Sequence, residues 1–244
     1  MQRYDFFSYF CKIIETTYIY TNIMETVIEF MRQLGAHNNK AWFDAHREDY
    51  EEMKRHLEEL AEEFIAGVAQ FDKRCKGLQV KDCTYRIYRD IRFSPDKTPY
   101  KHWCGVYVCP RGKRSGMAGY YFHVEPLTES YFLASGMYNP TKEVLQSVRE
   151  QIMLEPEEFE RSLRGCEDFV ASWETALKRI PSGYAREDGK ASEYLRLRDY
   201  SIVKKLTEAD MLSSDFMKNA LENLKRTLPF NELLNRCHEY AYEG

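Results

Sequence analysis

The sequence predicts a single α+β domain, in which an antiparallel sheet of about four or more strands packs against N- and C-terminal helices. Between residues 26 and 71, apolar residues recur every three or four positions, as on one face of a helix. Short β-branched and aromatic runs then follow one another from residue 83 to 135 with turn-rich separators, and helical spacing returns after residue 140. Consecutive strands without intervening helices indicate antiparallel pairing, and flanking helices indicate the α+β class.

Residues 1–23 are expected to be an N-terminal extension of doubtful relevance, with Met24 as a candidate true start. Their aromatic residues are interrupted by Asp5, Lys12 and Glu15, so the stretch is too short and too charged for a membrane span. It also lacks the features of a signal peptide. An ordinary N-terminal helix is the alternative, and the domain itself is expected to cover residues 24–244.

The first confident helix is expected over residues 26–34, with Gly35 as its stop, because glycine commonly follows a last helical turn. Asn38 or Asn39 is positioned to cap a long second helix. The apolar stripe of that helix comprises Phe43, His46, Tyr50, Met53, Leu57, Leu60, Phe64, Val68 and Phe71. Its opposite face carries many Asp and Glu residues, which is typical of a solvated helix face rather than a metal site.

Four strands are expected in the middle of the chain, over residues 83–93, 103–109, 119–125 and 130–135. Their separators are rich in Pro, Gly, Ser and Asp, as turns are. The absence of helical spacing between them predicts that neighbours in sequence are neighbours in the sheet.

The C-terminal third is expected to be helical. Pro140 suits a first helical position, and a short helix is expected over residues 156–163. Residues 180–189 have the composition of a loop. Thr207 and Asp210 have the spacing of a capping box, Ser214 is placed to cap the next helix, and Pro229 should break or kink the last helical stretch.

Composition excludes several classes of function. The net charge of −4 gives no global attraction to nucleic acid or to an anionic membrane, and no membrane span is expected. The seven cysteines are odd in number and scattered, and no CxxC occurs, which argues against disulfides and a zinc ribbon. Reduced thiols in the cytoplasm are the simplest interpretation. We expect no cofactor and no metal, and the sequence leaves the oligomeric state open.

The best candidate for a site is the segment 85–101, YRIYRDIRFSPDKTPYK, which carries five cationic side chains and only two aspartates. In a regular strand, Arg89 would share a face with Ile87 and Ile91. A buried guanidinium needs a carboxylate or a bound anion as partner, because burying it unpaired is costly.

Two interpretations remain open for this segment. In the first, the cations form a pocket for an oxyanion; the candidate ligand-binding residues are Arg86, Arg89, Arg92, Lys97, Lys101, Lys178 and Arg179. Asp90 and His123 are weak candidates for proton transfer. In the second, Asp90 and Asp96 neutralise the arginines, and the cluster is an internal ion-pair network that fixes the turn.

The motif from Arg86 to Ser94, RIYRDIRFS, continuing through Asp96 to Lys101, resembles the domain of unknown function 2461 family, a group of bacterial conserved hypothetical proteins. The resemblance runs from about Val27 to near the C-terminus. Supporting residues are Asn38, Asn39, Trp42, Phe43, Tyr50, Tyr120, Tyr121, His123, Gly136, Tyr138, Arg149, Leu177, Lys178, Arg179, Pro181 and Gly183. The resemblance implies that the basic motif is a family hallmark, but it implies no activity.

The function predicted best is therefore binding of a small ligand that carries phosphate or carboxylate, by a binding protein or an enzyme. The alternative is a protein-interaction module, without enzymatic activity, in which the Arg/Asp cluster is structural. Nucleic-acid binding is disfavoured by the acidic total and by the lack of a basic stripe. Whether the chain catalyses a reaction is left open.

Overall fold

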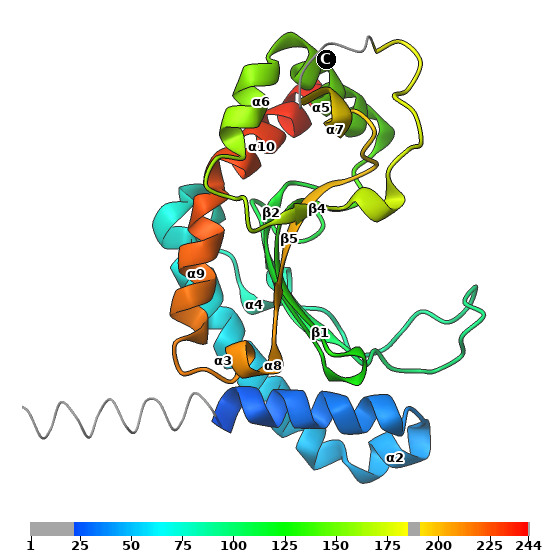
Figure 1. The fold of residues 1–244 in the computed structure, drawn as a ribbon. Coiled ribbons are helices and arrows are strands. Elements are labelled where there is room, and N and C mark those ends of the chain that lie inside the picture. Colours follow the sequence, from blue (N-terminus) through cyan, green and yellow to red (C-terminus); the bar gives the residue numbers. More distant parts are fainter. Residues whose placement is uncertain (1–21, 185–190, 244) are drawn as a thin grey trace, which may run out of the picture.

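The computed structural model describes residues 22–184 and 191–243, and it has the predicted α+β fold (Figure 1). A helix over residues 22–36 comes first. The remaining elements are α2 (Lys40–Ala45), α3 (Arg47–Phe71), η1 (Lys73–Cys75), α4 (Val80–Cys83), β1 (Cys104–Val108), β2 (Gly119–Glu125), η2 (Pro126–Thr128), β3 (Ser130–Met137), α5 (Lys142–Leu154), α6 (Pro156–Ser162), β4 (Val170–Ala171), η3 (Trp173–Thr175), α7 (Ala191–Tyr194), β5 (Tyr200–Leu206), α8 (Glu208–Met211), α9 (Phe216–Arg226) and α10 (Leu228–Glu243).

The sheet is antiparallel throughout, with strand order β1-β2-β3-β5-β4. The predictions for β1, β2 and β3 are confirmed, including their arrangement as neighbours. Strands β5 and β4 were not predicted. Strand β5 pairs with β3 from Tyr131 to Met137, so a segment from the C-terminal part of the chain completes the sheet.

One face of the sheet packs against helices and forms the core. Tyr120 and Phe122 of β2 are buried on this face, where Phe122 lies edge-on to Phe64 of α3, with ring centroids 5.2 Å apart. Phe216 of α9 packs edge-on against the same ring at 5.8 Å. Figure 1 shows α3 and α9 along this side of the sheet, with α5, α6 and α10 gathered at one end.

The opposite face of the sheet is only partly covered. Alternation along β2 places Tyr121 and His123 there, opposite Tyr107 of β1 and Phe132 of β3. Tyr107, Tyr121 and Phe132 are half-buried, whereas His123 is only 8% exposed. The His123 ring is stacked on Phe132, with centroids 4.5 Å apart.

The predicted strand over residues 83–93 is wrong. Helix α4 ends at Cys83, and the chain then forms only two isolated bridges, Thr84 with Val106 and Tyr88 with Tyr100. Apart from the single bridge of Thr84 to β1, the segment pairs with its own returning arm and not with the sheet. Residues 88–99 form a loop that extends away from the body of the domain (Figure 1), and we call it the projecting loop. Since the segment is not a regular strand, the predicted alternation of its side chains between two faces fails as well.

The helix boundaries differ in detail from those expected. The expected stop at Gly35 is wrong, since the first helix runs through it to residue 36. Gly35 instead permits a close approach to Leu127 and His102, because a Cβ there would lie 3.2 Å and 3.4 Å from their Cβ atoms. The long second helix is interrupted at His46, whose backbone is not helical. The prediction that Asn39 caps a helix is confirmed, since its side chain accepts a hydrogen bond from the Trp42 backbone N–H.

In the C-terminal part, the expected helix start at Pro140 is wrong, because Thr141 is the cap and its hydroxyl accepts a hydrogen bond that proline cannot. Likewise, Asp215 rather than Ser214 precedes α9. The capping box of Thr207 and Asp210 is confirmed, and so is a break next to Pro229.

Residues 1–21 lie outside the described residues, so the N-terminal extension and its alternative stay predictions. Met24 is fully buried in a helix already formed at residue 22. Among the helices of the described residues, none has the length and apolar character needed to cross a bilayer. The six cysteines in this part of the chain are buried and unpaired.

Candidate functional site

Arg89 is held by its own loop. Its guanidinium donates hydrogen bonds to the Asp96 carboxylate, to the Thr98 hydroxyl and to the Thr98 carbonyl oxygen, the last at 3.1 Å. The side chain is 23% exposed. Hydrogen bonds from Thr98, and then from Arg89, lower the pKa of Asp96 to about 2. The Arg89 guanidinium, for which the sequence predicts a need for an anionic partner, thus finds that partner within its own loop.

Arg92 and Lys97 also have partners inside the projecting loop. Arg92 donates two hydrogen bonds to Asp90, at 2.9 Å and 2.6 Å, and these bonds lower the pKa of Asp90. The Lys97 ammonium donates to the Ile91 carbonyl oxygen at 2.9 Å. For this part of the motif, the geometry matches an ion-pair network that fixes the loop.

Arg86 and Lys101 stand apart from these residues, because both line a cavity of about 620 Å³ at the base of the projecting loop. Its walls come from α3, α4, the segments before β1, and the loop between β1 and β2. We call it the basic cavity, and its cationic residues are Lys54, Lys81, Arg86, Lys101, Lys113 and Arg114. Glu58 is its only acidic lining residue. The apolar surface comes from Met53, Leu57, Ile87, Trp103 and Cys104.

Two lysines of the basic cavity are anchored beside the ring of Tyr85. The Lys101 ammonium donates to the Arg86 carbonyl oxygen at 2.5 Å and lies 5.8 Å from the Tyr85 ring centroid. The Lys113 ammonium donates to the Lys81 carbonyl oxygen and lies 6.0 Å from the same centroid. These contacts hold both ammonium groups near one ring and leave each with further N–H donors.

Five of the six cations of the basic cavity lack a carboxylate partner among the described residues. Lys54 pairs with Glu58 at 3.8 Å, but Lys81, Arg86, Lys101, Lys113 and Arg114 form no ion pair with any described residue. Burial, and then the neighbouring Arg86 charge, lower the pKa of Lys101. Like charges are therefore held together here, and a bound anion would relieve their repulsion.

Thiol chemistry is disfavoured in the basic cavity. Burial raises the pKa of the Cys104 thiol to about 12, so the nucleophilic thiolate is scarce at neutral pH. The part of the chain that the structure describes holds no group of three or more His, Cys, Asp or Glu side chains arranged for a metal ion.

Lys178 and Arg179 lie elsewhere. They follow β4, which forms the edge of the sheet opposite β1, whereas the basic cavity adjoins the β1 edge. The neighbouring Leu177 is fixed to Arg196 by a backbone hydrogen bond of 2.8 Å. Neither residue lines the basic cavity.

His123 and Asp90 are not brought together. Asp90 is committed to Arg92 in the projecting loop, whereas His123 lies on β2 between the Tyr121 hydroxyl (2.7 Å) and the Glu125 carboxylate (3.1 Å). Burial lowers the pKa of His123, although Glu125 opposes the shift. The ring of Trp103, which lines the basic cavity, is 5.5 Å from the His123 ring.

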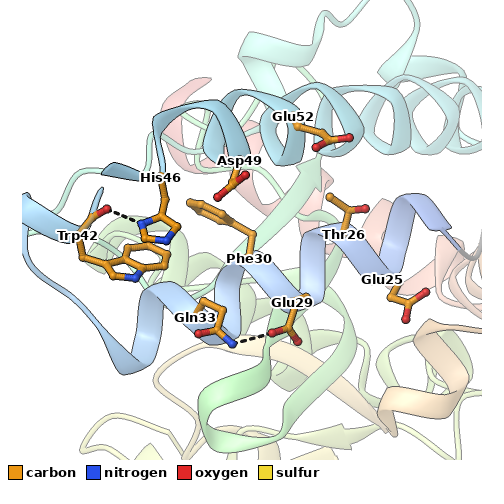
Figure 2. Close-up of a pocket in the computed structure, with 9 residues that line it drawn as sticks. All are labelled: Glu25, Thr26, Glu29, Phe30, Gln33, Trp42, His46, Asp49 and Glu52. Atoms are coloured by element: carbon orange, nitrogen blue, oxygen red, sulfur yellow. Dashed lines mark hydrogen bonds between the residues drawn. The ribbon is translucent and has the colours of Figure 1, made fainter. Parts of the chain in front are cut away.

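A second cavity, of about 430 Å³, has the opposite charge (Figure 2). It lies between the first helix and the α2–α3 region, where Phe30, His46 and the stacked ring of Trp42 form one part of its wall. Four carboxylates line it, from Glu25, Glu29, Asp49 and Glu52, and no lysine or arginine does. It would repel an anion, so the basic cavity is the better candidate for the anion site.

Four cations of the basic cavity were missed by sequence reasoning. Lys113 and Arg114 belong to a visibly basic turn, PRGKRSG, that was interpreted only as a strand separator. Lys54 and Lys81 are single lysines among other charged or polar residues. Only the packing of α3 and α4 against the segment before β1 brings these two into the same cavity.

Comparison with known proteins supplies one match. A family model described as Conserved hypothetical protein (DUF2461) matches residues 26–233, which confirms the resemblance inferred from the motif. No curated protein and no solved structure matches the chain.

Proposed function

The chain belongs to the DUF2461 family of conserved hypothetical proteins, whose description names no activity, and we propose that its basic cavity binds a small anionic ligand. One observation carries the proposal: five cations of one cavity have no carboxylate partner among the described residues. A site of this kind has the charge and the donors that phosphate or carboxylate groups require.

The remainder of the basic motif has a supporting role in this proposal. Arg89 pairs with Asp96 and Arg92 pairs with Asp90, and these ion pairs stabilise the projecting loop. Arg86 and Lys101, at the base of the loop, bind the ligand. The two interpretations of the sequence motif then apply to different residues of one segment. Lys178 and Arg179 are not part of the proposed site.

The test is thermal unfolding in the presence of phosphate, pyrophosphate and citrate at constant ionic strength. At ten times its Kd, a ligand stabilises the native protein by about 1.4 kcal/mol, which raises the Tm of a protein of this size by roughly 3–6 °C. Failure of all these anions to raise the Tm would remove the support for the proposal.

Arg86→Gln and Arg92→Gln form a matched pair, because each removes one arginine charge from the same segment. Arg86 lines the basic cavity, whereas Arg92 is exposed and held by Asp90 outside it. We expect Arg86→Gln to weaken anion binding at least tenfold and Arg92→Gln by less than twofold. Equal losses would mean that the anions respond to general charge and not to the basic cavity.

A protein-interaction role is the second candidate, favoured by Phe93, which is 94% exposed in the projecting loop. This ring buries little apolar surface within the described residues, and a partner that covered it would gain that burial. If this role replaces anion binding, Phe93→Ser will abolish capture of a partner from a cell extract, while phosphate and citrate leave the Tm unchanged.

A further inference from the structure

The charge of the basic cavity exceeds what a single small anion supplies. Lys81, Arg86, Lys101, Lys113 and Arg114 have no carboxylate partner among the described residues. A phosphate monoester carries a charge of about −1.5 to −2 at neutral pH. One such group would leave most of these cations unbalanced, whereas each further phosphoryl group adds negative charge.

The cations are also spread across the basic cavity. They come from α4, from the two arms at the base of the projecting loop, and from the loop between β1 and β2. Lys101, from the projecting loop's base, and Lys113, from the loop between β1 and β2, both approach the Tyr85 ring, and each is anchored to a different backbone carbonyl. A linear ligand with several charged groups can contact such a set at once, while a compact monoanion reaches only part of it.

The aromatic rings of the basic cavity are already engaged by cations. The Lys101 ammonium lies 5.3 Å from the Trp103 ring centroid, and His123 flanks the same indole. Tyr85 has Lys101 and Lys113 as neighbours. A nucleobase that stacked on these rings would compete with the ammonium groups, so recognition is expected to rest on charge.

From these three observations we propose that the ligand recognised by the basic cavity is a chain of two or three phosphoryl groups. This inference rests on the proposed anion-binding function and specifies its ligand class. The paired donors of the two arginines suit phosphoryl oxygens. The anchored lysines supply point charges along the chain.

The test is titration calorimetry with orthophosphate, pyrophosphate, tripolyphosphate and adenosine triphosphate at constant ionic strength. The affinity should rise at least tenfold from orthophosphate to tripolyphosphate. Adenosine triphosphate should bind within threefold of tripolyphosphate, because recognition is expected to rest on the phosphoryl charge.

Lys113→Gln and Lys97→Gln provide the matched variants, since both lysines donate to a backbone carbonyl but only Lys113 lines the basic cavity. Lys113→Gln should lower the affinity for tripolyphosphate at least fivefold and the affinity for orthophosphate by less than threefold. Lys97→Gln should change neither.

The outcomes separate the two levels of the proposal. If orthophosphate binds as tightly as tripolyphosphate, the phosphoryl chain is wrong and the anion site stands. If none of these anions binds, the phosphoryl chain is wrong, and the anion site stands only if citrate raises the Tm. An equal loss in Lys113→Gln and Lys97→Gln would also overturn the inference, because general charge would then explain the affinity.

Discussion

Replacing Arg89 by alanine tests whether this arginine stabilises the projecting loop or binds the ligand. The substitution removes a charged donor from the Thr98 carbonyl oxygen at 3.1 Å and from the exposed Asp96 carboxylate. A hydrogen bond from a charged donor contributes about 1.5–3 kcal/mol. The Arg89 side chain is 23% exposed, and the ion pair with the exposed Asp96 carboxylate is expected to add little. The substitution should therefore lower the free energy of unfolding by an amount near the lower end of this range, about 1–2 kcal/mol.

Urea denaturation measures this loss. For an m value of about 2–3 kcal/mol/M, the midpoint should fall by about 0.5 M. The affinity for tripolyphosphate should stay within twofold of wild type, because Arg89 does not line the basic cavity. A variant of unchanged stability that binds tripolyphosphate ten times more weakly would refute the assignment of Arg89 to the loop.

Two further predictions concern the pH dependence of binding and the core. Because the pKa of Lys101 is lowered by burial and by Arg86, this lysine loses its proton at a lower pH than an ordinary lysine. Anion affinity should therefore fall as pH rises toward 10, whereas Lys101→Arg, which stays charged, should remove this alkaline decline; calorimetry at pH 7.5 and 9.5 measures both. Phe64→Ala removes a fully buried ring that packs on Phe122, and it should lower the free energy of unfolding by about 3–5 kcal/mol in urea titrations; a loss below 1 kcal/mol would contradict the described core.

The parts of the fold that were predicted from sequence are those in which local pattern and final structure agree. Strand β2 is a run of aromatic and β-branched residues bounded by turn residues, so its strand preference is visible in the sequence itself. Helix α3 shows its buried stripe at helical spacing for the same reason. Asn39 and Thr207 were predictable as caps because capping depends on neighbours within one turn.

The errors occur where distant residues decide the structure. Strand β5 has a short apolar run, Ile202–Val203, followed by two lysines, and its partner β3 is far away in the sequence. Segment 83–93 has the composition of a strand, yet it makes a single bridge to the β1 edge and otherwise pairs with its own returning arm. Composition predicts a preference for extended backbone but not the partner that completes a sheet.

The candidate site was predictable only in part, for a related reason. The motif identified Arg86 and Lys101, but it could not separate them from Arg89 and Arg92, which are equally basic. Arg89 and Arg92 each form an ion pair with an aspartate of the projecting loop, whereas Arg86 and Lys101 do not. Which cations are paired depends on how that loop folds back. Lys54 joins the basic cavity only through the packing of α3.

The most direct test of the basic cavity is a crystal structure of the protein grown with tripolyphosphate. A polyphosphate site predicts density for linked phosphoryl groups inside the basic cavity, within hydrogen-bond distance of Arg86, Lys101 and Lys113. Density confined to the projecting loop beside Arg92, or an empty basic cavity at a saturating concentration of tripolyphosphate, would contradict it.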